Sequence, residues 1–276
     1  SVVAGGGGVN RQSADEIDAR EGSAPRLLVS VRHVDEVAAA IDGGADIIDV
    51  KETAHGSLGA ARPEVWSEVS AEVARRNRTK PSSNCAWSIA MGELLDPAIS
   101  PSNFGLEPSF AKVGLAGLAG HSSWRDLWFD WRRQLPTTTS PVAVVYADTD
   151  AAKSPEVSEI LEAGAAIGCR VMLVDTFSKE AGGLLEQVDV AELAKWCDIA
   201  RGASMRIALA GSLNSVSVTR VLELRPDWIA VRGAVCNNGR NGQVCPDKVR
   251  ELLEIIGELS SFRTPSPKHF SQLGGE

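Results

Sequence analysis

Short apolar runs recur along this chain, and most of them are hydrophobic throughout instead of at every second position. The eight runs are Leu27–Val31, Asp46–Val50, Cys85–Ala90, Phe110–Leu115, Val142–Tyr146, Arg170–Val174, Arg206–Ala210 and Trp228–Val231. A continuous apolar run of about four to eight residues is typical of a strand that is covered on both faces, as in a parallel sheet. The pattern therefore predicts eight parallel strands.

The segments between these runs carry apolar residues at intervals of three and four, as expected for helices with one buried face. Examples are Val34, Val37, Ala38 and Ile41, then Ile160 and Leu161, then Leu252, Ile255, Ile256 and Leu259. Prolines 63, 155 and 246 stand near expected helix starts, where the missing N–H costs nothing. Strands that alternate with helices over residues 26–262 have the size and order of a (β/α)8 barrel.

A doubly wound sheet is the alternative α/β architecture. Such a sheet would need a glycine-rich GxGxxG turn after its first strand. Here the first run continues into Arg32, His33, Val34 and Asp35. We therefore expect a single TIM-barrel catalytic domain at residues 26–262. Residues 1–25 are expected to form a flexible N-terminal arm, and residues 263–276 a short C-terminal tail, because both are polar or rich in Gly and Pro.

Composition narrows the classes of partner. The 276 residues are 43% hydrophobic, and 28 basic against 36 acidic residues give a formal net charge of −8. No basic stripe follows the chain, which disfavours nucleic acid as a partner. The apolar runs are far shorter than the ~18 residues that a membrane-spanning helix needs. We expect no membrane partner, and the sequence leaves open whether the chain forms a homo-oligomer.

The cysteines and histidines show no metal-binding spacing. The five cysteines are Cys85, Cys169, Cys197, Cys236 and Cys245, and no CxxC motif occurs. An odd number at irregular spacing argues against a disulfide framework or a zinc site and favours a cytoplasmic location. The four histidines are scattered, with no HxH or HExxH spacing. The sequence therefore predicts no metal centre.

Lysines and aspartates gather at the ends of three predicted strands, where the active site of a barrel lies. Asp49 and Lys51 end the second run and, being two apart, point the same way. Lys112 lies in the fourth run, Asp175 follows the sixth, and Lys179 comes four residues later. A lysine amine attacks a carbonyl only when neutral, and burial and neighbouring cations lower its pKa. We predict covalent catalysis by an amine; a structural network of ion pairs is the alternative interpretation.

The seventh and eighth runs end in small residues. Gly211 and Ser212 follow the seventh run, and Arg232 and Gly233 follow the eighth. Barrels often bind phosphate between these two loops, through backbone N–H groups. An arginine can add a charge-assisted hydrogen-bond fork. We therefore predict that these four residues bind a substrate phosphate. The alternative is a simple turn, with Arg232 bridging to Asp227 or Glu223.

Taken together, these blocks resemble the (5-formylfuran-3-yl)methyl phosphate synthase family, which makes the furan of methanofuran. The resemblance is carried by Leu27–Arg32, Gly43–Lys51, Gly56–Ala60, Lys112–Leu115, Asp175–Thr176, Ala208–Leu213 and Val231–Cys236. It covers roughly residues 26–262 in order. Two features depart from the family. The loop after Lys51 reads Glu-Thr-Ala-His where members often carry a proline, and the arm at residues 1–25 has no counterpart in compact members.

The resemblance implies a TIM barrel that condenses two molecules of glyceraldehyde 3-phosphate without metal or organic cofactor. It places the Schiff-base lysine of the family on Lys51 and the proton-accepting lysine on Lys112. It places the supporting acids and amine on Asp49, Asp175 and Lys179. A second triose would need a second anion site, for which Arg26, Arg32 and Lys179 are candidates. Another Schiff-base aldolase, a phosphosugar isomerase and a non-catalytic phosphosugar-binding protein remain alternative interpretations.

Overall fold

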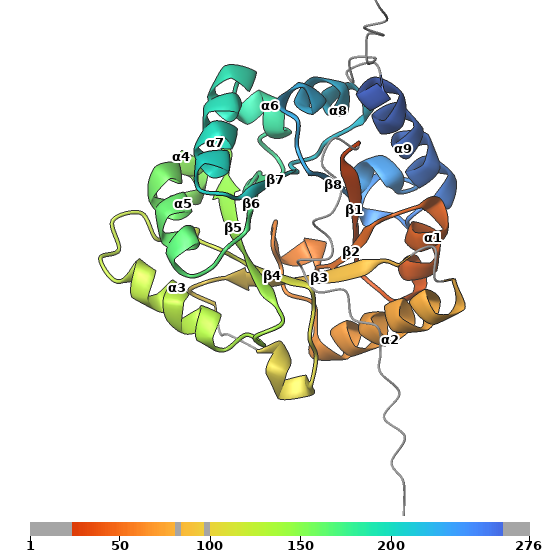
Figure 1. Ribbon diagram of the computed structural model, residues 1–276, viewed down its shortest axis with the longest axis horizontal. Coiled ribbons are helices and arrows are strands. Elements are labelled where there is room, and N and C mark those ends of the chain that lie inside the picture. Colours follow the sequence, from red (N-terminus) through yellow and green to blue (C-terminus); the bar gives the residue numbers. More distant parts are fainter. Residues whose placement is uncertain (1–23, 81–83, 97–99, 262–276) are drawn as a thin grey trace, which may run out of the picture.

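The strands form a closed barrel in which each pairs in parallel with the next along the chain and the last pairs back with the first. The structure is a computed structural model that describes residues 24–80, 84–96 and 100–261 (Figure 1). The prediction of a (β/α)8 TIM barrel is confirmed. The predicted arm and tail lie outside the described residues, except for residues 24 and 25.

Each predicted apolar run becomes one strand of the barrel, with ends shifted by a few residues. The strands are β1 (Arg26–Val31), β2 (Ile47–Val50), β3 (Ala86–Glu93), β4 (Phe110–Gly114), β5 (Ser140–Tyr146), β6 (Val171–Asp175), β7 (Arg206–Leu209) and β8 (Trp228–Val231). The register brings the two ends of the sheet together, because Leu27 pairs with Ile229 and Val29 with Val231. No edge strand is left in this sheet.

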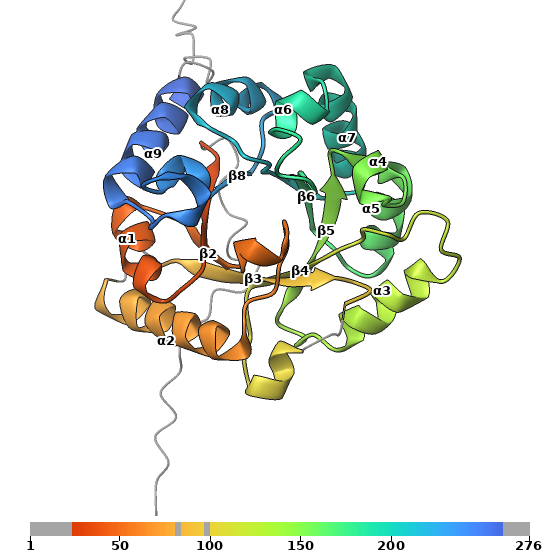
Figure 2. The ribbon, with the colours of Figure 1, turned by 180° about the vertical axis from the view of Figure 1, so that it is seen from behind.

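Helices surround the barrel on its outside, as the views from both ends show (Figures 1 and 2). The α-helices are α1 (Asp35–Gly43), α2 (Pro63–Thr79), α3 (Trp124–Arg133), α4 (Thr149–Ala152), α5 (Val157–Ala166), α6 (Leu184–Gln187), α7 (Val190–Gly202), α8 (Ser215–Val221) and α9 (Pro246–Ser261). Short 3-10 helices are η2 (Thr53–His55), η4 (Pro101–Phe104), η5 (Leu222–Leu224), η6 (Gly233–Val235) and η7 (Gly239–Asn241). Pro63 and Pro246 begin α2 and α9, as predicted.

Alternation along each strand divides the buried residues into an outer and an inner set. In β2, Ile48 and Val50 pack outward beneath the helices, whereas Ile47 belongs to the cluster inside the barrel. Successive side chains of a strand point to opposite faces, so Asp49 shares the inward face with Ile47. The outward face is apolar because the helices cover it, and the inward face becomes polar towards the C-terminal ends of the strands.

The same alternation applies to the other strands that carry predicted site residues. In β4, Ala111 and Val113 pack outward, and Lys112 between them points into the barrel, where it is 4% exposed. In β6, Val174 packs outward and Asp175 ends the strand on the inward face. Three strands therefore direct charged side chains to one end of the barrel interior.

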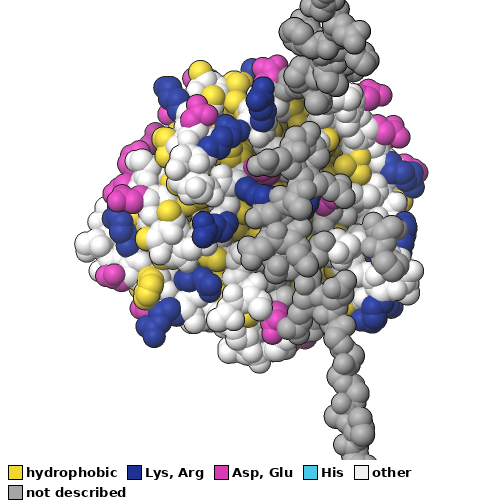
Figure 3. All heavy atoms as spheres, in the orientation of Figure 1, with side chains coloured by type: hydrophobic (Ala, Val, Ile, Leu, Met, Phe, Trp, Pro, Cys, Tyr) yellow, Lys and Arg dark blue, Asp and Glu magenta, His cyan; other side chains and the backbone are white. Residues whose placement is uncertain are grey.

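No helix within the described ranges is long and apolar enough to cross a membrane. On the face seen in Figure 3, basic side chains lie among acidic, apolar and uncharged ones.

The loop after β2 closes on itself and fixes where the strand ends. The N–H of Glu52 donates to the carbonyl of Gly59 over 2.8 Å, and the Glu52 carboxylate accepts the N–H of Ala54. A Cβ atom on Gly59 would overlap the Glu52 carbonyl oxygen and lie 2.7 Å from the Cβ of His55. Glycine is therefore required at residue 59 by close backbone approach.

We expect Gly59→Ala to lower the free energy of unfolding by about 1–3 kcal/mol, the usual cost of overpacking. Chemical denaturation would measure the change. Gly257→Ala is a matched control, because residue 257 lies in α9 with no atom within 4 Å of the added Cβ. That control should leave the free energy of unfolding unchanged or raise it slightly. Equal stability of Gly59→Ala and the wild type would contradict the close approach.

Candidate active site

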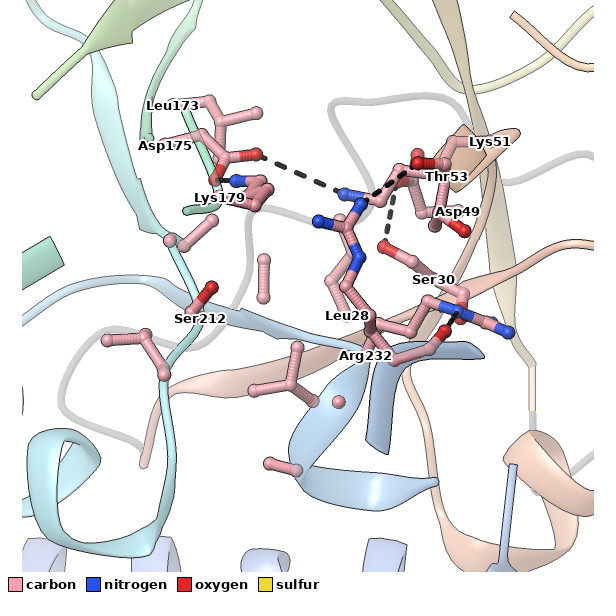
Figure 4. Close-up of a pocket in the computed structure, with 18 of the residues that line it drawn as sticks. Leu28, Ser30, Asp49, Lys51, Thr53, Leu173, Asp175, Lys179, Ser212 and Arg232 are labelled. Atoms are coloured by element: carbon pink, nitrogen blue, oxygen red, sulfur yellow. Dashed lines mark hydrogen bonds and ion pairs between the residues drawn. The ribbon is translucent and has the colours of Figure 1, made fainter. Parts of the chain in front are cut away.

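A cavity of about 360 Å³ opens at the C-terminal ends of the strands. Its volume is within the roughly 300–1,000 Å³ of small-molecule sites. All nine residues predicted from the sequence line it: Asp49, Lys51, Lys112, Asp175, Lys179, Gly211, Ser212, Arg232 and Gly233. Figure 4 shows the Asp175 and Lys179 side chains across this cavity from those of Asp49 and Lys51.

Asp49 and Lys112 form an ion pair deep in the cavity. The Lys112 Nζ donates to Asp49 Oδ1 over 2.5 Å, and the two side chains are 5% and 1% exposed, respectively. Two serine hydroxyls also donate to this carboxylate, Ser88 to Oδ1 over 2.6 Å and Ser30 to Oδ2 over 3.2 Å. The carboxylate is thus satisfied by groups from β1, β3 and β4, which hold the amine in one position.

A second ion pair lies on the β6 side of the cavity. The Lys179 Nζ donates to Asp175 Oδ1 over 2.7 Å and also to the carbonyl and hydroxyl oxygens of Thr176. The Ser57 hydroxyl, from the loop after β2, lies 2.6 Å from the carbonyl oxygen of Thr176 and 3.1 Å from Asp175 Oδ2, and can donate its one hydrogen to either oxygen. This hydrogen bond joins the loop that follows Lys51 to the end of β6.

Lys51 lies between the two pairs. Its Nζ is 4.0 Å from Asp175 Oδ2, and its side chain is 14% exposed, so the amine can be reached from the cavity. Lys112 and Lys179 each have several short hydrogen bonds to protein oxygens, whereas the Lys51 amine has only this long contact within the residues described. Of the three lysines, Lys51 is therefore the least constrained.

The buried environment shifts the pKa of the groups around Lys51. Burial acts to raise the pKa of Asp49, but the charges of Lys112 and Lys51 outweigh it, so the pKa is below its usual range. Burial likewise acts to raise the pKa of Asp175, and the charges of Lys179 and Lys51 lower it to about 2. Burial lowers the pKa of Lys112 and Lys179 against the opposing charges of their aspartates. The carboxylates are charged, and these two amines release a proton more readily than a lysine in water.

Backbone N–H groups at the ends of β7 and β8 form the other side of the cavity. Gly211 and Ser212 have φ of 93° and 52°, a left-handed pair that turns the chain sharply. The N–H groups of Gly211, Ser212, Gly233 and Ala234 make no hydrogen bond to another group within the described residues. Consecutive N–H groups in such turns can bind an anion.

Arg232 corrects one expectation, because its guanidinium is occupied by protein acceptors. It forms a two-pronged ion pair with Glu36 at 2.9 and 3.0 Å, and donates to the carbonyls of Ser30, Arg240 and Gly242. All five N–H donors of an arginine are thereby used. The side chain does not offer a fork to phosphate, nor does it pair with Asp227 or Glu223. It joins β1, α1 and the loop after β8 instead.

The three candidates for a second anion site differ in their position and in their ion pairs. Arg26 begins β1, at the end of the barrel opposite to the cavity, and is excluded by position. Arg32 follows β1 but pairs with Glu52 at 3.2 Å. Lys179 lines the cavity and pairs with Asp175. The structure adds Thr53 and Arg240, which line the cavity and were not singled out from the sequence. Arg240 lies 65 residues after Asp175 along the chain, outside any predicted strand end.

Comparisons with known proteins now bear on this site. A model of the 4-HFC-P synthase family matches residues 27–253. The chain is 33% identical over 237 residues to the (5-formylfuran-3-yl)methyl phosphate synthase of Methanopyrus kandleri, covering 84% of this chain and 99% of that protein. It is 30% identical over 234 residues to the synthase of Archaeoglobus fulgidus, with the same coverage.

The chain belongs to the 4-HFC-P synthase family. The matched region runs from the second residue of β1 into α9 and includes the nine predicted residues that line the cavity. The family resemblance stated from the sequence is thereby confirmed, and the chain is a member of a family of enzymes.

Solved structures with this fold are more distant. The thiamine phosphate pyrophosphorylase of Pyrococcus furiosus superposes with a TM-score of 0.56 at 14% identity, covering 86% of this chain and 96% of that one. The phosphoribosyl anthranilate isomerase of Thermotoga maritima gives 0.55 at 14% identity, covering 85% and 99%. At this identity the likeness shows the barrel fold alone.

In this 4-HFC-P synthase family member, no group of three or more His, Cys, Asp or Glu residues that could hold a metal ion occurs among the described residues.

We expect Arg232→Ala to lower the free energy of unfolding by about 3–5 kcal/mol, because Glu36 would keep a buried charge without its partner. Thermal and chemical denaturation would measure the loss. Arg220→Ala on α8 is a control that removes an exposed arginine. Wild-type stability in Arg232→Ala, together with weakened phosphate binding, would restore the phosphate role of this side chain.

The pKa of Asp175 predicts a pH dependence of stability. A folded-state pKa of about 2 lies below the ~3.9 of an unfolded aspartate, so the ionised form stabilises the fold. That contribution, about 2–3 kcal/mol, is complete above pH ~4 and is lost as the pH falls towards 2. When denaturation is measured between pH 6 and pH 2, the free energy of unfolding should therefore fall less in Asp175→Asn than in the wild type. Parallel curves would contradict the shifted pKa.

Proposed function

We propose that this protein condenses two molecules of glyceraldehyde 3-phosphate to (5-formylfuran-3-yl)methyl phosphate, with release of one phosphate and two waters. Carbon, oxygen and phosphorus balance with this stoichiometry, and no oxidant is needed. The reaction is that of a carbon–oxygen lyase, and its product would serve the synthesis of a methanofuran-type cofactor. The observation that carries the proposal is the accessible Lys51 amine between two buried Asp–Lys pairs, in a chain of this family.

The charge of the cavity supports an anionic substrate. Four basic side chains face two aspartates: Lys51, Lys112, Lys179 and Arg240 against Asp49 and Asp175. Arg232 does not add to this excess, because Glu36 neutralises it. Two positive charges are left over when all three lysines are charged, and one remains once Lys51 is in the neutral form that attacks a carbonyl. In a partly enclosed site such a charge interacts strongly with a phosphate.

Lys51 is the amine that forms the imine. In its neutral form it adds to the aldehyde carbon of one triose phosphate, and the adduct loses water. The imine withdraws electrons from the adjacent carbon, so a proton there can leave and the carbon can attack the carbonyl of the second triose. The Asp175 carboxylate, 4.0 Å from Nζ, stabilises the positive charge of the iminium.

Lys112 moves protons during the eliminations that make the ring aromatic. Burial lowers the pKa of Lys112, so this amine releases a proton more readily than a lysine in water, as a group that passes protons must. Asp49 orients it through the 2.5 Å hydrogen bond and stabilises its charged form after each transfer. Lys179 holds Asp175 in the ionised state that the iminium requires.

The phosphate that remains in the product is held by the N–H groups of Gly211, Ser212, Gly233 and Ala234. These groups line the cavity and lack protein acceptors among the described residues. Loops after the seventh and eighth strands are the usual phosphate site of this fold. The five cysteines are free thiols, which supports a cytoplasmic location.

Incubation with glyceraldehyde 3-phosphate tests the reaction directly. We expect a furan aldehyde, followed by its ultraviolet absorbance, and one phosphate released for each furan formed. Reversible cleavage of a ketose phosphate without furan would show a different Schiff-base aldolase. Interconversion of sugar phosphates would show an isomerase, and binding without turnover would show a phosphosugar-binding protein.

Borohydride reduction in the presence of substrate should attach a triose to the peptide that contains Lys51. Lys51→Arg should give neither adduct nor furan while it keeps the wild-type melting temperature, because a guanidinium stays protonated and cannot attack a carbonyl. Lys195→Arg, an exposed lysine of α7, is the matched control. An adduct on Lys112 or Lys179 would transfer the role, and furan formation without any adduct would exclude the imine.

A further inference from the structure

Arg240 crosses the mouth of the cavity from the loop after β8 to the loop after β2. It lies in η7, and its carbonyl accepts the Nε–H of Arg232 over 2.7 Å. Its backbone packs against Gly233, because a Cβ atom added to that glycine would lie 3.5 Å from the backbone nitrogen of Arg240. Its own Nη2 donates to the carbonyl of Thr53 over 3.1 Å. The Arg240 side chain is therefore held at both ends, at its backbone and at its guanidinium.

This arginine differs from the other basic side chains of the cavity in having no carboxylate oxygen within 4.0 Å among the described residues; Asp175 acts on it only at longer range. Lys112 pairs with Asp49, Lys179 with Asp175 and Arg232 with Glu36. Lys51 is 4.0 Å from Asp175. Arg240 is half-buried, yet its one hydrogen bond goes to a neutral carbonyl and leaves four of its five N–H donors without a protein acceptor there.

A second polar group beside Arg240 also has no partner. The Thr53 hydroxyl is buried, makes no hydrogen bond and belongs to a residue that lines the cavity. A buried hydroxyl without a partner costs free energy, so its position calls for a ligand or a functional reason. Thr53 comes two residues after Lys51, in the loop that departs from the family pattern. A positively charged fork and a hydroxyl together fit the oxygens of a phosphate monoester.

We propose that Arg240 and Thr53 form a second phosphate subsite, which takes the phosphate of the second triose. Figure 4 shows Thr53 and Ser212 on opposite sides of the cavity, so the Thr53 side of this subsite lies away from the N–H groups after β7. The assignment of the ligand to a triose rests on the proposed function, whereas the binding of a phosphate does not. It replaces Arg26 and Arg32 as the second anion site.

Calorimetric titration of the full chain with inorganic phosphate tests the subsite without reference to turnover. We expect two phosphates to bind to the wild type and Arg240→Gln to weaken one of them by roughly 10- to 100-fold, as for loss of a charge-assisted hydrogen bond. Thr53→Val should weaken the same phosphate by about 3- to 10-fold without lowering the melting temperature, since the hydroxyl has no protein partner. Arg78→Gln, an exposed residue in the last turn of α2, controls for the loss of one positive charge.

Kinetics then identify the source of the phosphate. In Arg240→Gln the half-saturating concentration of glyceraldehyde 3-phosphate should rise by a similar factor, while borohydride at saturating substrate still traps the triose on Lys51. Wild-type phosphate affinity in both variants would overturn the subsite. Weakened phosphate binding with an unchanged half-saturating concentration would overturn the assignment to the second triose. If the wild type makes no furan but binds phosphate through Arg240 and Thr53, the proposed function fails and the phosphate subsite stands.

Discussion

Two aspartates with almost no exposure carry negative charge inside this barrel, towards the C-terminal ends of its strands, and the geometry of the site depends on how that charge is stabilised. Asp49 and Asp175 are 1% and 2% exposed. A buried carboxylate without partners would take up a proton, because burial disfavours the charged form. Here each is held by one lysine and by hydroxyl groups from neighbouring strands and loops. The result is two fixed Asp–Lys pairs with a third, less constrained amine between them.

Further ion pairs and hydrogen bonds hold the elements around these two pairs. Arg232 and Glu36 join the last strand to the first helix where the sheet closes, and the same Glu36 carboxylate accepts the N–H of Arg32. On the other side of the barrel, Asp148 accepts the N–H groups of Phe177 and Ser178. The loop that carries Lys179 is therefore fixed at its start.

A further buried pair closes the β3–β5 side of the barrel. The Tyr146 hydroxyl donates to Glu93 over 2.5 Å, the N–H of Ala116 donates to the same carboxyl group, and the Tyr146 ring packs edge-on against Phe177. Burial raises the pKa of Glu93. A Cβ on Gly114 would overlap this pair, so glycine is needed two residues after Lys112. That requirement gives a physical reason for the Lys-Val-Gly block in the sequence.

The sequence by itself determined the barrel, the strand positions and the five charged residues at the strand ends. Short continuous apolar runs are typical of strands covered on both faces, and alternation along a strand then predicts that Asp49 and Lys112 point inward. Those inferences use spacing along the chain alone. The pairing of Arg232 with Glu36, which are 196 residues apart, depends on closure of the last strand against the first. The sequence therefore predicted a phosphate contact for Arg232 and offered only the nearby Asp227 and Glu223 as alternative partners. Only the tertiary structure decided that all donors of Arg232 are used, and that the Thr53 hydroxyl and four donors of Arg240 have no acceptor among the described residues. Whether a polar group has a partner depends on what the fold brings beside it.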